Sequence, residues 1–267
     1  MTTGALIFAF NNEQIDYLAM ARWSAKNINR HLGIPTAVIT NNSFVEFEYE
    51  RCIVVDQPPK DNARWFADLQ GSVTWYNGNR IDAYSLSPWE QTLVLDSDYV
   101  VAGNQLISLL DSDQDFLAHR WAYDVTGLQD FEGLNYFGTY RMPMWWATVM
   151  MFRQSKQAEL IFETMQMIRK HWTHYRNLYG NPNITYRNDH ALSIALGIVN
   201  GHTLNHAGIP WNLASLTPEH ILIQTAQDQY RVEYITPDKK KKWIALNNVD
   251  FHAMGKGHLG EIIANNS

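Results

Sequence analysis

The stretch ALIFAF, Ala5–Phe10, decides the fold that this sequence predicts. Six consecutive apolar residues that end at a pair of asparagines are typical of a strand buried on both faces of a sheet. Apolar residues then recur at helical spacing from Gln14 to Leu32, and Gly33 followed by Pro35 gives the stop that helix ends prefer. Thr36–Thr40 has the composition of a second strand. Because strand, helix and strand follow one another so closely, we expect a βαβ unit with parallel strands.

The rest of the chain continues as one α/β domain. The further strands and helices that we expect are Cys52–Val55, Gln91–Leu95, Met150–Phe152, Glu159–Trp172 and Asp189–Val199. No repeat, low-complexity tract or linker rich in proline and glycine divides the sequence. We therefore predict a single domain over residues 1–267, with a Rossmann-like mixed sheet flanked by helices. Ligands of such sheets bind where strands end at their carboxyl edges.

Composition excludes several classes of protein. The chain has 267 residues, of which 46% are apolar and 18% charged, and its net charge is −6 at pH 7. These fractions are typical of a globular protein rather than a disordered one. Cys52 is the single cysteine, so neither an internal disulfide nor a cysteine-based zinc site can form. The acidic balance argues against wholesale binding of nucleic acid, although it leaves room for a local basic face.

The sequence shows neither a targeting signal nor a membrane span. The start, Met1–Gly4, lacks basic residues, and the apolar runs Ala5–Phe10 and Met142–Phe152 are too short to cross a bilayer. We therefore expect a soluble cytoplasmic protein that does not bind membranes. A virus-encoded protein that acts in the cytoplasm of its host fits the same expectation.

Two carboxylates follow the apolar strand Gln91–Leu95. Asp96 and Asp98 stand at the edge of the predicted sheet, where they repel each other unless a cation neutralises them. Mg²⁺ or Mn²⁺ prefers carboxylate oxygens and keeps coordination sites for phosphate oxygens. A solvated turn whose aspartates cap the next segment is the alternative, because Asp-x-Asp is a common pattern. The abrupt change from a core strand to an acidic pair favours the metal site.

A second polar cluster, Asp250–His258, lies near the C-terminus. It places His252, Gly255 and Lys256 within a few residues. An imidazole is a further metal ligand, a glycine lets the backbone approach a ligand closely, and a lysine can bind a diphosphate. A surface turn with an incidental histidine is the alternative. Together with the acidic pair, His252 completes a predicted metal site.

The stretch from Asn79 to Asp98 resembles the glycogenin-like glycosyltransferases of the GT-A fold. Those enzymes carry a Lys or Arg, an apolar segment with Ser-Leu, a strand and Asp-x-Asp, and the offset from Arg80 to Asp96 matches their spacing. Their C-terminal His-x-x-Gly-x-x-Lys pattern is matched at His252 and Gly255. Here His258 stands at the lysine position, and Lys256 lies two residues earlier.

This resemblance implies a transferase with a nucleotide-sugar donor. The chain would move a hexosyl group, glucose before others, from a UDP-sugar to a hydroxyl acceptor, with Mn²⁺ or Mg²⁺ and with retention of the anomeric configuration. Residues 1–101 would form the nucleotide-sugar-binding half. Residues 102–267 would form the acceptor half and carry the C-terminal metal-binding segment.

The resemblance also implies roles for individual residues. Asp98 and His252 would bind the metal directly, and Asp96 would bind the metal or the ribose. Arg80 would add a fixed positive charge near the donor, and Asp189 would hold the transferred sugar or stabilise charge at its anomeric carbon. Tyr17 would stack on uracil. The other implied donor contacts are Phe10, Asn11, Asn12, Ser97, Gly255 and Lys256.

The acceptor is less visible in the sequence. The chain contains 10 Trp, 13 Tyr and 11 Phe, and aromatic residues mix with basic ones at His119–Trp121, Tyr140–Arg141 and His171–Arg187. Such surfaces can stack on sugars or bind bases and phosphates. The alternative is that these aromatic residues only pack in the interior of the fold. Lys239–Lys242 predicts an exposed hairpin turn that could touch nucleic-acid phosphate. A glycan, a protein hydroxyl and a hydroxymethylated pyrimidine in viral DNA are the acceptors that we consider.

Two other classes of protein remain open. A nucleotidyltransferase shares a nucleotide-binding sheet and an acidic metal site, but it more often has a glycine-rich phosphate loop where this chain has Phe10–Glu13. A non-catalytic module that binds sugar or nucleic acid would use the aromatic residues. Such a module has no need for the acidic pair together with His252.

Overall fold

The computed structural model describes residues 2–57, 62–66, 70–203 and 206–266. A six-stranded sheet forms its centre, in the order β3-β2-β1-β6-β12-β8. These strands are β1 (Thr3–Phe8), β2 (Thr36–Thr40), β3 (Glu50–Val54), β6 (Gln91–Leu95), β8 (Phe116–His119) and β12 (Trp146–Arg153). The first four strands in the spatial order are parallel, whereas β12 runs antiparallel to both of its neighbours. The expected α/β fold with a mixed sheet is confirmed.

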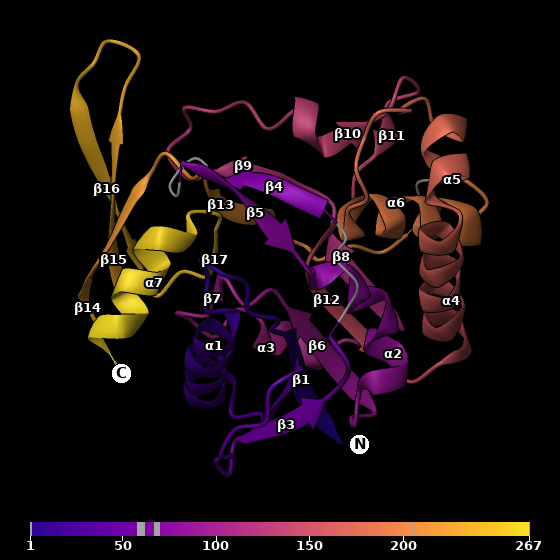
Figure 1. The fold of residues 1–267 in the computed structure, drawn as a ribbon, viewed down its shortest axis with the longest axis horizontal. Helices are drawn as coiled ribbons and strands as arrows, with labels where there is room; N and C mark the ends of the chain where they lie inside the picture. The colour runs from indigo at the N-terminus through magenta and orange to yellow at the C-terminus, as the bar shows by residue number, and fades with distance from the viewer. Residues whose placement is uncertain (1, 58–61, 67–69, 204–205, 267) are drawn as a thin grey trace.

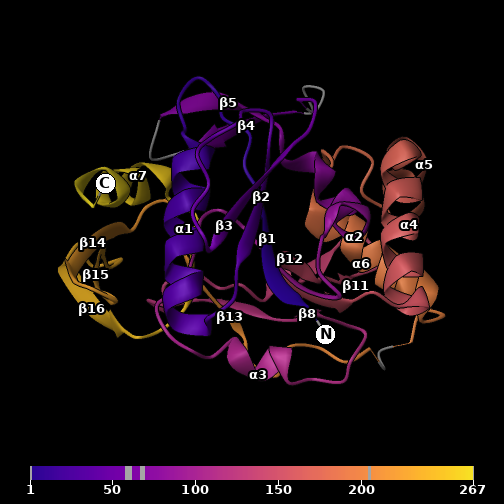
Figure 2. The same cartoon turned by 90° about the horizontal axis from the view of Figure 1, so that it is seen from below.

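Helices cover both faces of this sheet (Figure 2). The helices are α1 (Tyr17–Leu32), α2 (Ala83–Leu86), α3 (Ile107–Leu110), α4 (Lys156–Lys170), α5 (Trp172–Leu178), α6 (Asn188–Val199) and α7 (Lys256–Asn265). Helix α1 packs on β1, β2 and β3, and α6 packs on β12 with α4 beside it. Strands β2 and β6 are buried along their whole length, which is why their sequences contain no charged residue and show no alternation of apolar and charged positions.

Two smaller sheets accompany the central sheet, one that begins with β7 directly after β6 and one that lies beside α1 (Figure 1). One has the order β7-β17-β13-β9, and the other is the antiparallel sheet β14-β15-β16. Their strands are β7 (Tyr99–Val100), β9 (Ala122–Asp124), β13 (Leu213–Leu216), β17 (Phe251–Ala253), β14 (Ile221–Ala226), β15 (Gln229–Ile235) and β16 (Lys241–Asn247). Two short hairpins complete the described strands, β4 (Asn62–Phe66) with β5 (Gly71–Trp75), and β10 (Tyr136–Phe137) with β11 (Met142–Pro143).

The opening βαβ unit has the predicted order with shifted ends. Strand β1 ends at Phe8 rather than Phe10, because Ala9 and Phe10 enter the core after the last residue of the parallel ladder. Helix α1 begins at Tyr17, since the carboxylate of Asp16 accepts a hydrogen bond from the amide of Ala19. It ends as predicted at Gly33, whose φ of 67° is left-handed.

The long helix predicted at Glu159–Trp172 is two helices, α4 and α5. Helix α4 starts earlier than expected because the hydroxyl of Ser155 accepts a hydrogen bond from the amide of Ala158. It ends at Lys170, one residue before His171, after which α5 begins at Trp172. The exposed turn predicted for Lys239–Lys242 is confirmed for Lys239 and Lys240, which lie between β15 and β16, whereas Lys241 and Lys242 are the first residues of β16. Within the described residues, no helix has the length and apolar character that a bilayer crossing needs.

The burial of His119 predicts that the stability of the protein depends on pH. His119 is fully buried at the end of β8, and burial lowers its pKa from 6.5 to about 4. The unfolded chain therefore takes up this proton at a higher pH than the folded chain, so the free energy of unfolding falls as pH drops from 6.5 toward 4. Between about pH 7.5 and about pH 5, the wild type should lose about 2 kcal/mol more than His119→Gln, which lacks this titration.

Urea unfolding at the two pH values measures the difference. The other buried histidines titrate in both proteins, so their contributions cancel in the comparison. Equal losses of stability in the wild type and in His119→Gln would contradict the assignment.

Candidate active site

The two acidic residues and the histidine of the predicted metal site come together through strand pairing. Asp96 and Asp98 lie in the turn between β6 and β7, where the amide of Tyr99 donates to the carbonyl of Asp96 at 3.0 Å. Strand β17 pairs with β7 and sets His252 opposite Tyr99. The amide of Ala253 also donates to the carbonyl of Asp98 at 3.0 Å. The short antiparallel pair of β7 and β17 thus places the segment that contains His252 beside the turn that contains Asp96 and Asp98.

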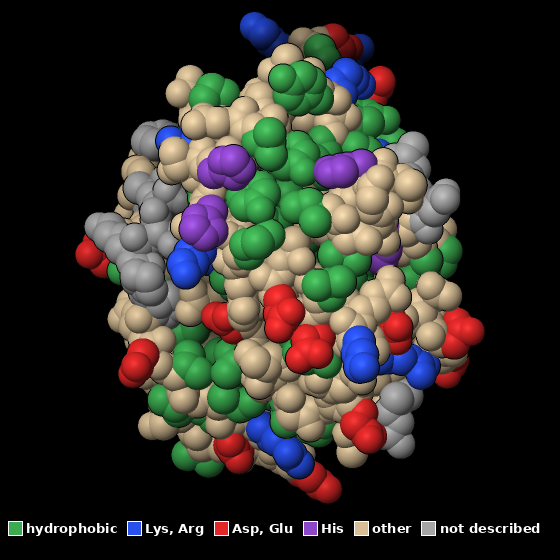
Figure 3. Space-filling model, turned by 90° about the vertical axis from the view of Figure 1, so that its right-hand side faces the viewer, with side chains coloured by type: hydrophobic (Ala, Val, Ile, Leu, Met, Phe, Trp, Pro, Cys, Tyr) green, Lys and Arg blue, Asp and Glu red, His purple; other side chains and the backbone are tan. Residues whose placement is uncertain are grey.

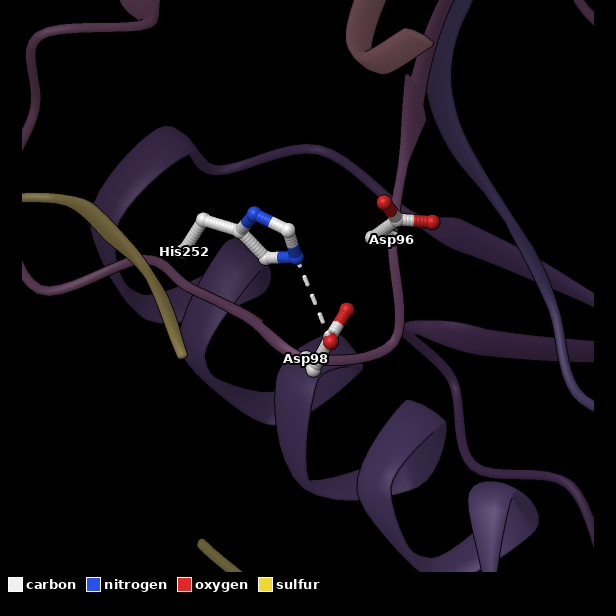
Figure 4. A group of neighbouring side chains, drawn as sticks. All are labelled: Asp96, Asp98 and His252. Atoms are coloured by element: carbon white, nitrogen blue, oxygen red, sulfur yellow. Dashed lines mark ion pairs between the residues drawn. The ribbon is translucent and has the colours of Figure 1, made fainter. Parts of the chain in front are cut away.

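The three side chains point into one space (Figure 4). One oxygen of each carboxylate and one imidazole nitrogen all lie within 4.8 Å of one another. Nε2 of His252 is 3.3 Å from Oδ2 of Asp98. Two carboxylates and an imidazole form a donor set that suits Mn²⁺ or Mg²⁺ with coordination positions left over. The residues present therefore fit the metal that the sequence predicts.

The protonation state of His252 fits this role. Burial lowers the pKa of its imidazole to about 4, and the nearby carboxylate of Asp189 only partly opposes that effect. The ring is therefore neutral at pH 7, as a metal ligand must be. Its Nδ1 is buried and has no hydrogen-bond partner among the described residues.

Two cations hold the carboxylates. Arg80 forms an ion pair with Asp96, and Lys256 forms one with Asp98. Arg80 also donates from NH1 to the carbonyl of Ala147 at 2.9 Å. Burial lowers the pKa of Arg80 to about 10, so its guanidinium stays charged at pH 7. The cluster thus brings positive charge to the place where a diphosphate would meet the metal.

Asp189 faces the same cavity from the first turn of α6. Its Oδ1 accepts from the amide of Ala147 at 2.9 Å, and its Oδ2 accepts from Arg187 at 2.9 Å. Burial raises the pKa of this carboxyl, but Arg187, the Ala147 amide and other nearby cationic groups outweigh burial and leave the pKa below its ordinary value. Asp189 is therefore a fixed carboxylate at pH 7.

A cavity of about 230 Å³ joins these groups. Among the residues predicted to bind the donor, Tyr17, Arg80, Ser97 and Lys256 line it together with the three metal-site residues. Lining residues that the sequence did not single out as donor or metal contacts are Trp75, Trp146, Thr148, Arg187, Asn188, Pro218 and Met254. No local pattern marks most of them, although Met254 stands two residues after His252 and Arg187 two residues before Asp189.

Four predicted donor contacts are placed elsewhere. Phe10 is 1% exposed and belongs to the core. Asn11 and Asn12 shape the turn before α1: Oδ1 of Asn11 accepts from the amide of Leu18, and Oδ1 of Asn12 accepts from the amide of Ile15. Gly255 is the residue at which α7 begins, and its backbone does not line the cavity.

Lys256 and His258 lie in different surroundings in the structure. Lys256 lines the cavity and pairs with Asp98, whereas Nδ1 of His258 lies 3.8 Å from Glu261 on α7. Of these two candidates for the diphosphate, Lys256 is therefore the one placed beside the metal site.

No protein-family model matches this chain, and no curated protein matches it. Solved structures of glycosyltransferases do match. GlyE of Streptococcus pneumoniae TIGR4 aligns with 78% of this chain and 45% of its own, at 14% identity and a TM-score of 0.45. The galactosyltransferase LgtC, in complex with donor and acceptor sugar analogs, aligns over 73% of this chain and 70% of its own, at 15% identity and a TM-score of 0.47.

Mouse xyloside xylosyltransferase 1 aligns with 81% of this chain and 88% of its own, at 12% identity and a TM-score of 0.43. The chain spans less than half the length of the pneumococcal glycosyltransferase. At such identities the chemistry of this protein has to follow from its own cavity.

Proposed function

We propose that this protein is a metal-dependent glycosyltransferase. It transfers a hexosyl group, glucose before others, from a UDP-sugar to a hydroxyl acceptor, with retention of the anomeric configuration. One observation carries the proposal: Asp96, Asp98 and His252 meet in a single cavity that also contains Arg80, Lys256 and Asp189. A metal site with cations beside it, facing a separate fixed carboxylate, suits a leaving diphosphate on one side and a sugar on the other.

The leaving group determines what the cations do. When the hexosyl group departs, negative charge develops on the β-phosphate. Asp96, Asp98 and His252 would hold a divalent ion, which would supply positive charge to stabilise that leaving group. Lys256 lies at the same place and adds a further positive charge for the diphosphate. Arg80 holds Asp96 in position from a buried site.

Asp189 is the candidate group for holding the sugar. Asp189 is held rigidly by the Ala147 amide and by Arg187, so its carboxylate keeps one orientation. Such a group can accept hydrogen bonds from sugar hydroxyls or stabilise positive charge at the anomeric carbon. The aromatic rings of Tyr17 and Trp75 line the cavity and are the candidates for stacking on uracil.

The described surface favours a glycan or protein hydroxyl over DNA as the acceptor. Lys240 pairs with Asp238 at 2.7 Å, and Lys241 pairs with Glu233 at 2.6 Å, so neighbouring carboxylates offset much of the charge of the lysine run. The β15–β16 hairpin that carries these lysines also lies on the opposite side of the molecule from α4 and α5 (Figure 1). On the face that carries α4 and α5, apolar and histidine side chains gather in the upper part, and acidic and basic side chains lie below them (Figure 3).

A donor assay tests the proposal. The protein is incubated with a panel of UDP-sugars and Mn²⁺, and the slow release of UDP by hydrolysis is measured with and without a chelator. We expect Mn²⁺-dependent release of UDP, with one sugar preferred. Release of pyrophosphate from a sugar phosphate and UTP would instead identify a nucleotidyltransferase. A protein that neither releases UDP nor binds it by calorimetry would be a non-catalytic module, and the proposal would fail.

A further inference from the structure

A second cavity, of about 540 Å³, lies next to the candidate active site without sharing any of its lining residues. Adjacent residues of the chain separate the two cavities: Trp146 lines the active-site cavity, and Trp145 lines the second one. Helix α6 borders both cavities, since Asp189 faces the first and Ser193 the second. The second cavity is therefore built on the wall that fixes the proposed catalytic carboxylate.

An exposed indole is the main feature of the second cavity. Trp121 is 40% exposed, although Arg120 lies over its ring at 4.0 Å from the centroid. Trp121 lines the cavity, and Arg120 covers one face of its ring. The ring of Tyr136 packs edge-on at 6.0 Å, which holds the indole in place. A fixed, exposed aromatic face of this kind is suited to stacking against a flat or CH-rich ligand.

The cavity offers little charge to a ligand. Among the described residues that line it there is no Asp, Glu or Lys, and Arg120 is the single Arg. That guanidinium donates from NH1 to the carbonyls of Asn135 and Met144, at 3.2 and 3.1 Å, and its plane rests on aromatic rings. Burial lowers the pKa of His206, another lining residue, to about 4, so that ring is neutral at pH 7.

The other polar groups that line the cavity include uncharged hydrogen-bonding groups and a second histidine, His202. Asn200, Thr203 and Asn212 line the cavity, and Asn212 is exposed. Nε2 of His206 is buried without a hydrogen-bond partner among the described residues. An aromatic platform surrounded by amides and hydroxyls matches a ligand with apolar faces and a rim of hydroxyl groups, which describes an uncharged sugar ring.

We propose that this cavity is a second saccharide-binding site, which takes a neutral sugar ring of a glycan acceptor at a distance from the reacting hydroxyl. The assignment of that sugar to the acceptor rests on the proposed function. Nucleic acid is the weaker candidate, because its phosphates require cations, and the one guanidinium here already donates to carbonyls of the chain.

Two hydrogen bonds connect the second cavity to the first turn of α6, which carries Asp189. The amide of Trp145 donates to the hydroxyl of Ser193 at 2.7 Å, and that hydroxyl donates to the carbonyl of Asp189 at 2.6 Å. A sugar that rests beside Trp145 and Ser193 therefore packs on the residues that hold the first turn of α6. Binding there positions a glycan and at the same time stabilises the wall of the active site.

Binding to an array of neutral and acidic oligosaccharides, without UDP-sugar or metal, tests the proposal. We expect neutral oligosaccharides to bind, and the Trp121→Ala variant to bind them about tenfold more weakly or worse. Trp121→Phe should restore part of the affinity, because it restores an aromatic face. The matched control is Trp243→Ala, which removes an indole that is 62% exposed on β16 and should leave binding unchanged.

Separate readouts keep this proposal apart from the proposed function. Donor hydrolysis by Trp121→Ala should equal that of the wild type, because the residue does not line the active-site cavity. If Trp121→Ala does not fold, Asn212→Ala, which changes an exposed side chain, should show the same loss of binding. Equal binding by the wild type and both variants, binding of single-stranded DNA in preference to neutral glycans, or binding of no neutral glycan would each overturn the second site, whatever the outcome of the UDP assay.

Discussion

Asp98→Asn is expected to lower Mn²⁺-dependent release of UDP by about a thousandfold. The substitution preserves the size of the side chain but removes a charge at the centre of the proposed metal site. Asp98 is 5% exposed and contacts both His252 and Lys256, so no other carboxylate at the site has the same surroundings. With that charge lost, the site binds a divalent ion poorly, and the β-phosphate loses its main stabilisation in the transition state.

A thermal-shift titration with Mn²⁺ gives this prediction a readout apart from turnover. A ligand that binds only the folded state raises the melting temperature, so Mn²⁺ should stabilise the wild type and leave Asp98→Asn unchanged. Asp113→Asn is the matched control, because Asp113 is an exposed aspartate outside the cavity. Near-native turnover by Asp98→Asn, with an unchanged response to Mn²⁺, would remove the metal site from the proposal.

Asp189→Asn should lower kcat about a hundredfold while the affinity for UDP stays close to that of the wild type. Asn retains an oxygen that can accept from the Ala147 amide, so the start of α6 should keep its place. The substitution removes the negative charge of the Asp189 carboxylate, which Arg187 and other nearby groups keep ionised. If that charge stabilises the sugar as the anomeric bond breaks, its loss affects the chemical step rather than nucleotide binding.

The control for Asp189→Asn comes from another helix. Glu159 also lies in the first turn of a helix, α4, but its side chain is exposed. Glu159→Gln therefore removes a carboxylate that interacts with a helix N-terminus without touching the cavity, and it should leave kcat unchanged. Calorimetry with UDP separates binding from turnover. An unchanged kcat in Asp189→Asn would show that this carboxylate does not act on the sugar.

Two strands of the central sheet were the most predictable elements of the fold. Thr36–Thr40 and Gln91–Leu95 match β2 and β6 residue for residue, because both strands are buried on each side and contain no charged residue. Strand β8 was not predicted, and only Met150–Phe152 of β12 was. The ends of neighbouring elements were less predictable, since apolar residues such as Phe10 continue into the core after the ladder has ended. The two-residue strand β7 is too short for any periodicity to reveal.

Local patterns marked the site residues that lie next to each other in sequence, and the family resemblance added Tyr17, Arg80 and Asp189. Asp96 and Asp98 share one turn, and His252 and Lys256 share one segment, so local patterns marked both groups. Trp75, Thr148 and Pro218 reach the cavity from separate strands and loops. Their side chains are ordinary for the places they occupy, and tertiary packing alone brings them to the site.

The pairing of β17 with β7 also sets the order in which the protein becomes competent during synthesis. The acidic turn that contains Asp96 and Asp98 leaves the ribosome early, together with the strands of the parallel sheet. His252 and Lys256 follow only after most of the chain has been made. A nascent chain can therefore build its central sheet first, as domains generally fold from the N-terminal side during translation. It cannot close the proposed metal site until β17 has emerged and paired with β7, so metal affinity would report that this pairing has formed.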